Sequence, residues 1–129
     1  MFKEKVRSYE QQKMSKAEAL ENLKKLLERE SDYRKAMKCV QAIGKLEPTI
    51  DGDFKHLEQL SVSDEHNMVR SAAVEVLGKY HAERLVPVLE WIVKNEQSLV
   101  VLWEAYHTIS LYLTRKRTKE QTNAKISAL

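Results

Sequence analysis

Apolar residues recur at intervals of three and four along most of the chain, which is the spacing of one face of an α-helix. The first strong stripe is preceded by Ser15, with Glu18 three residues later in the pattern of a capping box, which predicts a helix over about residues 16–30. A second stripe ends at Gly44, and Pro48 just beyond it is a further stop signal. No segment alternates strictly between apolar and polar residues, so the chain is predicted to be all-α.

Less marked signals predict four more helices after the second stripe. A third and a fourth helix are expected to begin at polar caps, for which the candidates are Asp53 and either Asp64 or Asn67. The fourth helix should end near Gly78, and a fifth should follow it. A sixth helix is predicted over about residues 99–113, where the chain is almost continuously apolar.

The second, fourth and sixth helices correspond to one another at a nearly fixed period. Laying Gly44 on Gly78, an offset of 34 residues, aligns residues 36–45 with residues 70–79, and laying Gly78 on Ser110 continues the pattern at an offset of 32. Such a period is typical of a helical solenoid, in which each hairpin buries its apolar face only by stacking on the next. The prediction is one domain over residues 1–129, made of an N-terminal helix or arm, three hairpins and a basic tail: residues 1–16, 17–48, 53–82, 85–114 and 115–129.

The stretch that ends at Gly78 resembles the second helix of a HEAT repeat, in particular of the HEAT-like repeats named after phycocyanobilin lyases. Asp64 is followed five and six residues later by Val69 and Arg70, and then by small residues and the pair Leu77 and Gly78. The resemblance implies a right-handed α-α superhelix, or HEAT-like solenoid, of about three helical hairpins.

The resemblance also implies structural roles for the motif residues. Asp64 and Arg70 hold the positions of an ion-pair ladder between neighbouring repeats, and Gly78 holds a position where helices approach closely. The first and third hairpins have Glu30 and Glu96 in place of the aspartate, and neither has the arginine. The ladder is therefore expected to be broken, with Arg70 paired only locally.

The composition excludes several classes of protein. Three Gly and two Pro in 129 residues are too few for an all-β fold, and they leave no glycine-rich phosphate loop. The one cysteine, Cys39, excludes a disulfide framework and a multi-cysteine zinc site, fits a cytoplasmic protein, and is expected to be a buried, inert thiol. No membrane-spanning or secretory segment is expected, since apolar stretches are short and the first residues are charged throughout.

Charge is unevenly distributed although the net charge is only +3, because residues 1–16 and 115–129 are basic and the middle of the chain is acidic. Arg34, Lys38 and Lys45 lie on one face of the second predicted helix. In HEAT arrays second helices line the concave surface, so one end of the groove would be basic and would attract phosphates or an acidic partner. A solvated lysine face is the alternative interpretation.

The sixth predicted helix is apolar on almost every side, although the last repeat of an array normally has a polar outer face. Something is therefore expected to cover it. One candidate is the tail, docking as a capping helix through Ile126 and Leu129. The other is a second copy of the chain or a different protein, with Trp103, Tyr106 and Tyr112 as aromatic anchors.

The basic cluster after the sixth helix consists of Arg115, Lys116, Arg117 and Lys119. The negative C-terminal end of the helix dipole can explain two of these residues, and the others are candidates for phosphate contacts. This is a weak signal for nucleic acid, because the cluster lacks the interleaved aromatic residues of single-strand-binding proteins.

No catalytic motif is present in the sequence, and the four histidines lack metal-ligand spacing, so no metal or cofactor is expected. An enzyme would need a pocket with convergent titratable groups, such as His107 near Glu104 or Glu75. The sequence therefore favours a non-enzymatic interaction or scaffold module that binds another protein, a second copy of itself included, through the concave groove and the apolar C-terminal hairpin. The alternative is a nucleic-acid-binding HEAT-like protein that uses the basic N- and C-terminal segments.

Overall fold

The computed structural model describes residues 15–46 and 52–128, which form five α-helices and no strand, as the apolar periodicity predicted. The expected N-terminal helix falls within residues 1–16, nearly all of which lie outside the described residues. The helices are α2 (Lys16–Arg29), α3 (Tyr33–Lys45), α4 (Gly52–Ser63), α5 (Asn67–Asn95) and α6 (Leu99–Ser127).

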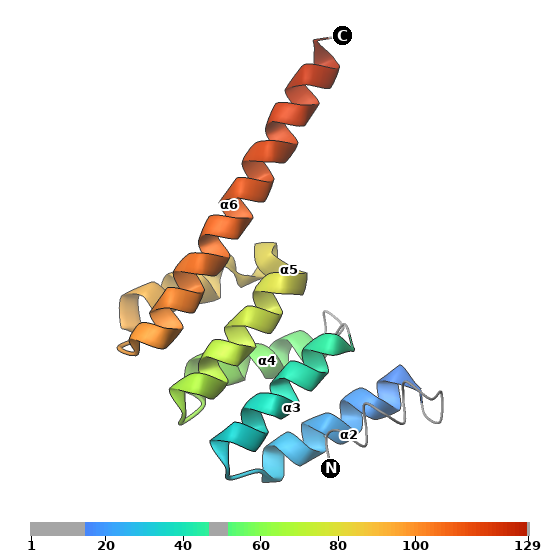
Figure 1. Cartoon of the computed structure of the whole chain (residues 1–129), viewed down its shortest axis with the longest axis vertical. Helices are drawn as coiled ribbons and strands as arrows, with labels where there is room; N and C mark the ends of the chain where they lie inside the picture. The colour runs from blue at the N-terminus through green and yellow to red at the C-terminus, as the bar shows by residue number, and fades with distance from the viewer. Residues whose placement is uncertain (1–14, 47–51, 129) are drawn as a thin grey trace.

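Helix α5 combines the fourth and fifth predicted helices, which the sequence had separated near Gly78. The chain bends at His81, whose φ of −136° and ψ of 40° are not helical, so that α5 consists of two halves that run in different directions (Figure 1). The first half packs with α4, and the second half is followed by α6. Consecutive helices thus form three pairs at about the positions of the three predicted hairpins.

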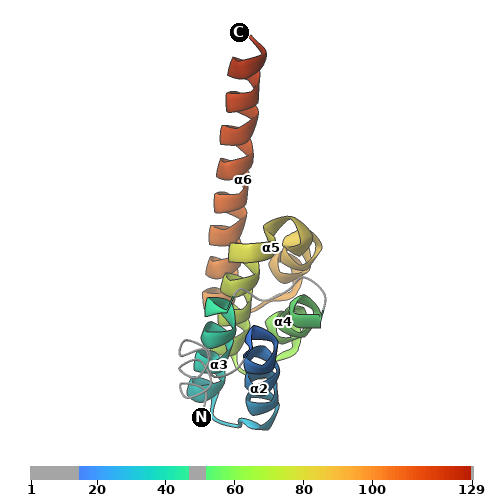
Figure 2. The same cartoon turned by 90° about the vertical axis from the view of Figure 1, so that its right-hand side faces the viewer.

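The helices are arranged in two layers. Helix α3, the first half of α5 and α6 lie side by side, with α3 in contact with α5 and α5 in contact with α6 (Figure 1). Helix α2, α4 and the second half of α5 lie on the other side of this layer (Figure 2). Large apolar side chains between the layers are fully buried, among them Leu23, Ile43, Leu57, Leu77, Leu85 and Ile92.

Glycine permits close approach at both contacts within the first layer. A Cβ atom on Gly44 would lie 2.8 Å from Cγ2 of Val76, and one on Gly78 would lie 2.5 Å from Cγ2 of Thr108. The two glycines are 34 residues apart and their two neighbours 32 apart, the same offsets that align the helices in the sequence. The α3–α5 and α5–α6 contacts therefore have the same register.

Two predicted helix caps are wrong. Asp53 lies inside the first turn of α4, where it is buried and forms an ion pair with Lys24 of α2, so its carboxylate joins the first two pairs instead of capping a helix. His66, and neither Asp64 nor Asn67, caps α5, with its Nδ1 accepting a hydrogen bond of 3.1 Å from the backbone N–H of Met68. An imidazole nitrogen replaces the usual oxygen acceptor here.

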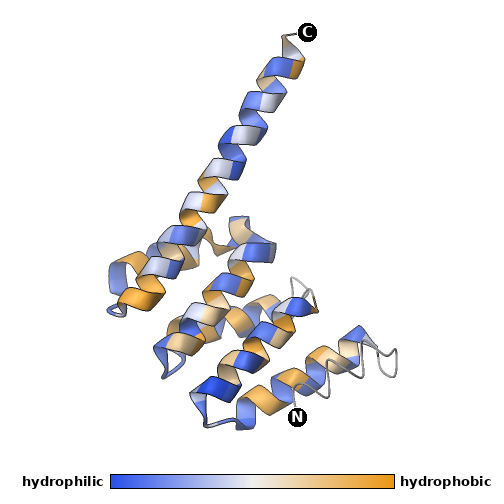
Figure 3. Cartoon of the chain, viewed as in Figure 1, coloured by the Kyte–Doolittle hydropathy of each residue, from blue (hydrophilic) through white to orange (hydrophobic). Residues whose placement is uncertain are grey.

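Helix α6 does not end near residue 113 but continues to Ser127 and projects from the rest of the molecule (Figure 1). Neither Gly nor Pro occurs within α6, and its last part is rich in Lys, Arg, Glu and Gln, which favour helix. This projecting part is mostly hydrophilic (Figure 3), and Ile126 is 62% exposed. The prediction that the tail folds back as a cap is therefore wrong for residues 115–128, and Leu129 lies outside the described residues.

Candidate functional site

The loop that joins the two helices of each pair is built in the same way. Glu30, Asp64 and Glu96 each accept a hydrogen bond from the backbone N–H two residues later, at 3.0, 2.9 and 3.1 Å. In each case that N–H belongs to the residue at the N-cap position of the next helix. The acidic residues are spaced by 34 and then 32 residues, so the loops repeat with the helices.

Arg70 corrects the expectation that it pairs only locally. Its Nε and Nη2 both donate to the carboxylate of Glu96 at 2.9 Å, and its Nη1 donates to the backbone carbonyl of Asp64 at 2.8 Å. Burial opposes ionisation of Glu96, but hydrogen bonds from Arg70 and the loop N–H groups outweigh it, so the pKa of Glu96 is lowered. Arg70 therefore joins the second and third pairs, because Glu96 holds the position that aspartate has in the motif.

The corresponding contact between the first and second pairs uses different chemistry. Ala36 occupies the position that corresponds to Arg70, so this junction lacks the guanidinium. Instead the rings of Tyr33 and His66 stack, with centroids 3.7 Å apart and planes within 1° of parallel. The motif residues Asp64, Arg70 and Gly78 thus lie at junctions between pairs.

The predicted basic stripe lies on α3, at the opposite end of the layer from α6 (Figure 1). Arg34, Lys38 and Lys45 are all exposed, and Nε of Arg34 donates to the hydroxyl of Tyr33 at 3.3 Å. The first half of α5 separates this stripe from α6. The polar and aromatic sets predicted from the sequence are therefore two separate surfaces.

Two of the three predicted aromatic anchors share a surface of α6, and the third does not. Trp103 and Tyr106 are exposed and lie on one side with Leu99 and Leu113, and these four residues are called the end face. Tyr112 is partly buried and nine residues beyond Trp103, about two and a half turns, so it lies on the opposite side of the helix. The sequence could not separate them, because α6 is apolar all round.

The end face is exposed because, within residues 15–46 and 52–128, no further helix packs against it. Tyr106 is 57% exposed, whereas Val40 and Val74, at the corresponding positions of α3 and α5, are both 0% exposed. In those helices the residues lie in a layer that continues with the next pair. The next pair thus covers this position in α3 and again in α5, whereas no described helix covers it in α6.

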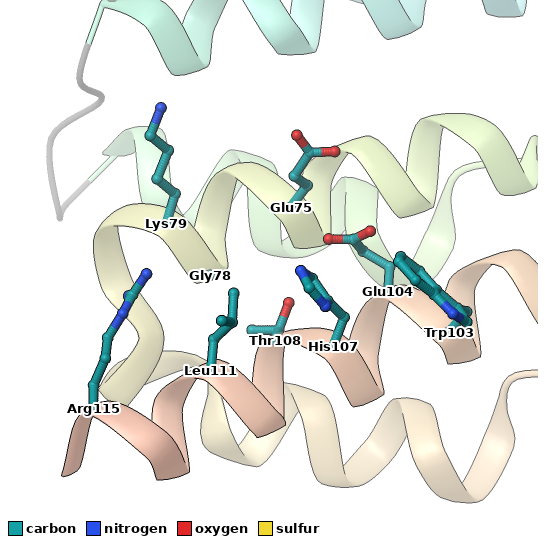
Figure 4. A pocket seen from close by; sticks show the side chains of 9 residues that line it. All are labelled: Glu75, Gly78, Lys79, Trp103, Glu104, His107, Thr108, Leu111 and Arg115. Atoms are coloured by element: carbon teal, nitrogen blue, oxygen red, sulfur yellow. The ribbon is translucent and has the colours of Figure 1, made fainter. Parts of the chain in front are cut away.

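A cavity of about 480 Å³ lies between the first half of α5 and α6 (Figure 4). The rings of Trp103 and His107 stack at one side of it, with centroids 5.1 Å apart and planes 10° from parallel. Glu75 and Glu104 lie near these rings, and Lys79 and Arg115 lie toward the other end (Figure 4). The lining residues are Glu75, Gly78, Lys79, Trp103, Glu104, His107, Thr108, Leu111 and Arg115.

Glu104 is the most unusual residue of this cavity. The residue is only 9% exposed, and within residues 15–46 and 52–128 its side chain has no hydrogen-bond or ion-pair partner. Burial and the nearby charge of Glu75 raise the pKa of Glu104, and the partial opposing effect of His107 does not cancel them. An isolated carboxylate in such surroundings is costly to ionise and gains from any cation that reaches it.

An enzyme was expected to need a pocket with convergent titratable groups, and the residues named as examples, His107, Glu104 and Glu75, do line this cavity. Among the described residues, no hydrogen bond joins His107 to either carboxylate, and no cluster of three or more His, Cys, Asp or Glu side chains could hold a metal ion.

The predicted phosphate contacts lie on the projecting part of α6. Arg115, Lys116, Arg117 and Lys119 are all exposed, but consecutive residues point about 100° apart around a helix. Their charges are thus spread around α6 and do not form one basic face. Arg115 alone also lines the cavity.

Comparison of the chain with protein-family models, with curated proteins and with solved structures finds no match. In the described part of the chain, none of the helices has the combined length and apolar character needed to cross a membrane. The class of protein that fold and site define is an all-helical one, with repeated helix pairs, a charged cavity and an exposed apolar end face.

Proposed function

We propose that the chain is a short HEAT-like α-solenoid, with its three helix pairs forming a right-handed superhelix. Two recurrences support this proposal: the acidic loop residues and the glycine contacts both repeat at offsets of 34 and 32 residues. A cytoplasmic setting is part of the proposal, because Cys39 is a free, buried thiol.

The solenoid acts as a non-enzymatic protein-interaction module, and its end face is the principal contact. The observation that carries this function is the contrast between Tyr106, which is 57% exposed, and the fully buried Val40 and Val74 at corresponding positions. The end face corresponds in position to the surfaces of α3 and α5 that contact the next helix pair. It is therefore suited to bind the apolar face of a helix, as those surfaces do. The binding partner is therefore a polypeptide with an amphipathic helix.

The chemistry of the end face fits this partner. Leu99, Trp103, Tyr106 and Leu113 follow one another at intervals of four, three and seven residues, a stripe that runs along one side of α6. Large aromatic side chains at the centre of such a stripe are the residues that usually contribute most to binding. Arg34, Lys38 and Lys45 on α3 offer a separate polar contact for an acidic part of the same partner.

Nucleic-acid binding has weaker support from the same surfaces. The cations of α6 are distributed around the helix, and the basic stripe of α3 lies at the other end of the layer. A phosphate backbone needs cations along one continuous path, which these two groups do not form.

The substitution Tyr106→Glu tests the function, because it places a charge in the middle of the end face. Ile126→Glu is the matched control, since Ile126 is similarly exposed, at 62%, and lies on the same helix about 30 Å farther along. Sedimentation velocity over a range of concentrations measures self-association, and capture from the lysate of the source cells followed by reconstitution with the purified protein measures binding to another partner.

The expected result is an association, with a second copy or with the reconstituted partner, that Tyr106→Glu weakens by roughly a hundredfold or more and that Ile126→Glu leaves unchanged. A monomer that captures the same proteins with and without Tyr106→Glu would overturn the proposed function. Circular dichroism establishes that both variants keep the helix content of the parent.

A further inference from the structure

We propose that the cavity between α5 and α6 binds the side chain of an arginine or lysine carried by the partner. This inference rests on the proposed function and names the chemistry that the partner presents beside its apolar helix. The cavity is separate in its chemistry from the end face, with which it shares only Trp103.

The carboxylate of Glu104 carries the inference. The residue as a whole is nine-tenths buried, lines the cavity and lacks an ion-pair or hydrogen-bond partner among the described residues. Charged groups that proteins bury are normally paired, because an unpaired one forfeits its hydration without compensation. A cation that enters the cavity supplies that missing partner.

The groups around Glu104 favour a cation with an extended apolar stem. Glu75 brings a second carboxylate to the same side of the cavity (Figure 4), so the charge there is negative. The indole of Trp103 offers a flat aromatic surface, on which a guanidinium or ammonium group stacks favourably. Thr108 and Leu111 line the cavity as well and can contact the aliphatic part of such a side chain.

The volume of the cavity sets the size of its occupant, and its two cations, Lys79 and Arg115, set the orientation of that occupant. About 480 Å³ is within the usual range for sites that bind small ligands, and it accommodates one long side chain with part of its backbone. Lys79 and Arg115 lie away from the two carboxylates (Figure 4), where they can contact backbone carbonyls or an acidic neighbour of the bound residue. The cavity therefore suits a basic side chain whose own backbone runs past it in one fixed direction.

The test uses fluorescein-labelled pentapeptides with a central arginine, lysine or citrulline between alanines, titrated into the full-length protein at low ionic strength and followed by fluorescence anisotropy. Citrulline has nearly the shape of arginine without its charge. The protein variants are Glu104→Gln and Glu75→Gln, with Glu90→Gln as control, because Glu90 is an exposed carboxylate on the second half of α5.

The arginine or the lysine peptide is expected to bind at least about tenfold more tightly than the citrulline peptide, the effect of one charge-assisted hydrogen bond. Glu104→Gln should abolish that preference, Glu75→Gln should reduce it, and Glu90→Gln should preserve it. Equal affinity for all three peptides, or an equal loss in Glu104→Gln and Glu90→Gln, would overturn the inference.

The end-face variant separates this inference from the function on which it rests. Tyr106→Glu should prevent association with the partner and leave the preference for the basic peptide intact, since Tyr106 does not line the cavity. Loss of partner binding in Tyr106→Glu, together with no effect of Glu104→Gln on the peptides, would refute the cavity proposal and leave the function standing.

Discussion

At the scale of single residues, Glu104 gives the clearest case of a side chain whose surroundings oppose its charge. Burial, and then the charge of Glu75, raise its pKa above the ordinary value of a glutamate. The protonated form is thus favoured by folding, so its contribution to stability is complete below the ordinary pKa and is lost as the pH rises through the raised pKa. At neutral pH the ionised carboxylate opposes folding.

Glu104→Gln is therefore expected to raise the free energy of unfolding at pH 7.5 and to leave it almost unchanged at pH 3.5, where glutamate is protonated in both states. Urea unfolding of the parent and the variant at both pH values measures the difference. The assigned environment would be contradicted by a variant that is less stable than the parent at pH 7.5. It would also be contradicted if the difference in free energy of unfolding between variant and parent were the same at both pH values.

At the scale of the elements, the bond between Arg70 and Glu96 fixes the first half of α5 to the start of α6. Both side chains are largely buried, and the guanidinium binds the carboxylate through two nitrogens. Arg70→Ala removes these bonds and leaves Glu96 buried with only loop N–H groups, so we expect it to lower the free energy of unfolding by about 2–4 kcal/mol. Chemical denaturation measures the loss.

Arg70→Lys should restore only part of this stability, because an ammonium group cannot make the two parallel bonds of a guanidinium. Lys94→Ala is a suitable control, since Lys94 is an exposed cation on the same helix. If Arg70→Ala costs no more than Lys94→Ala, the junction does not depend on this ion pair.

At the scale of the whole molecule, the approach of the first half of α5 to α6 depends on Gly78. A Cβ there would lie 2.5 Å from Thr108 Cγ2, closer than atoms in contact can be. We expect Gly78→Ala to lower the free energy of unfolding by about 1–3 kcal/mol, although alanine favours helix by about 1 kcal/mol over glycine. Adding Thr108→Ala should recover much of the loss, as thermal unfolding of both variants will show.

Gly52→Ala provides the matched control for that substitution. Its Cβ would meet only Lys24 Nζ, at 3.8 Å, so this variant should be at least as stable as the parent. If Gly78→Ala is tolerated equally well, the two helices are not held at the distance that the structure shows.

Much of the architecture could be predicted because it depends on local features of the chain. The stripe that starts after Ser15 gave α2 to within one residue, and the spacing of Gly44 and Gly78 gave the register of two junctions. The end of α6 could not be placed in the same way. The sequence after residue 113 has a change of composition but no stop signal, and composition alone does not end a helix.

The candidate site was predicted less completely. Trp103 and Tyr106 were singled out because they are large aromatic residues in the last pair, and both are exposed on the end face, but Tyr112 was grouped with them although it lies on the other side of the helix. Glu96 was recognised at the position of the motif aspartate, yet its bond to Arg70 was not foreseen, because a pairing across 26 residues depends on how two loops meet.

The amino-acid sequence by itself determined that the described chain is helical, roughly where most of its helices lie, and the period at which they recur. These properties follow from backbone hydrogen bonds and side-chain spacing within a few residues. Only the tertiary structure decided that, among the described residues, the end face stays open, Arg70 reaches Glu96, and Glu104 is buried without a partner. Each of these outcomes depends on packing between residues far apart in the chain, where distance in space is not encoded by spacing in sequence.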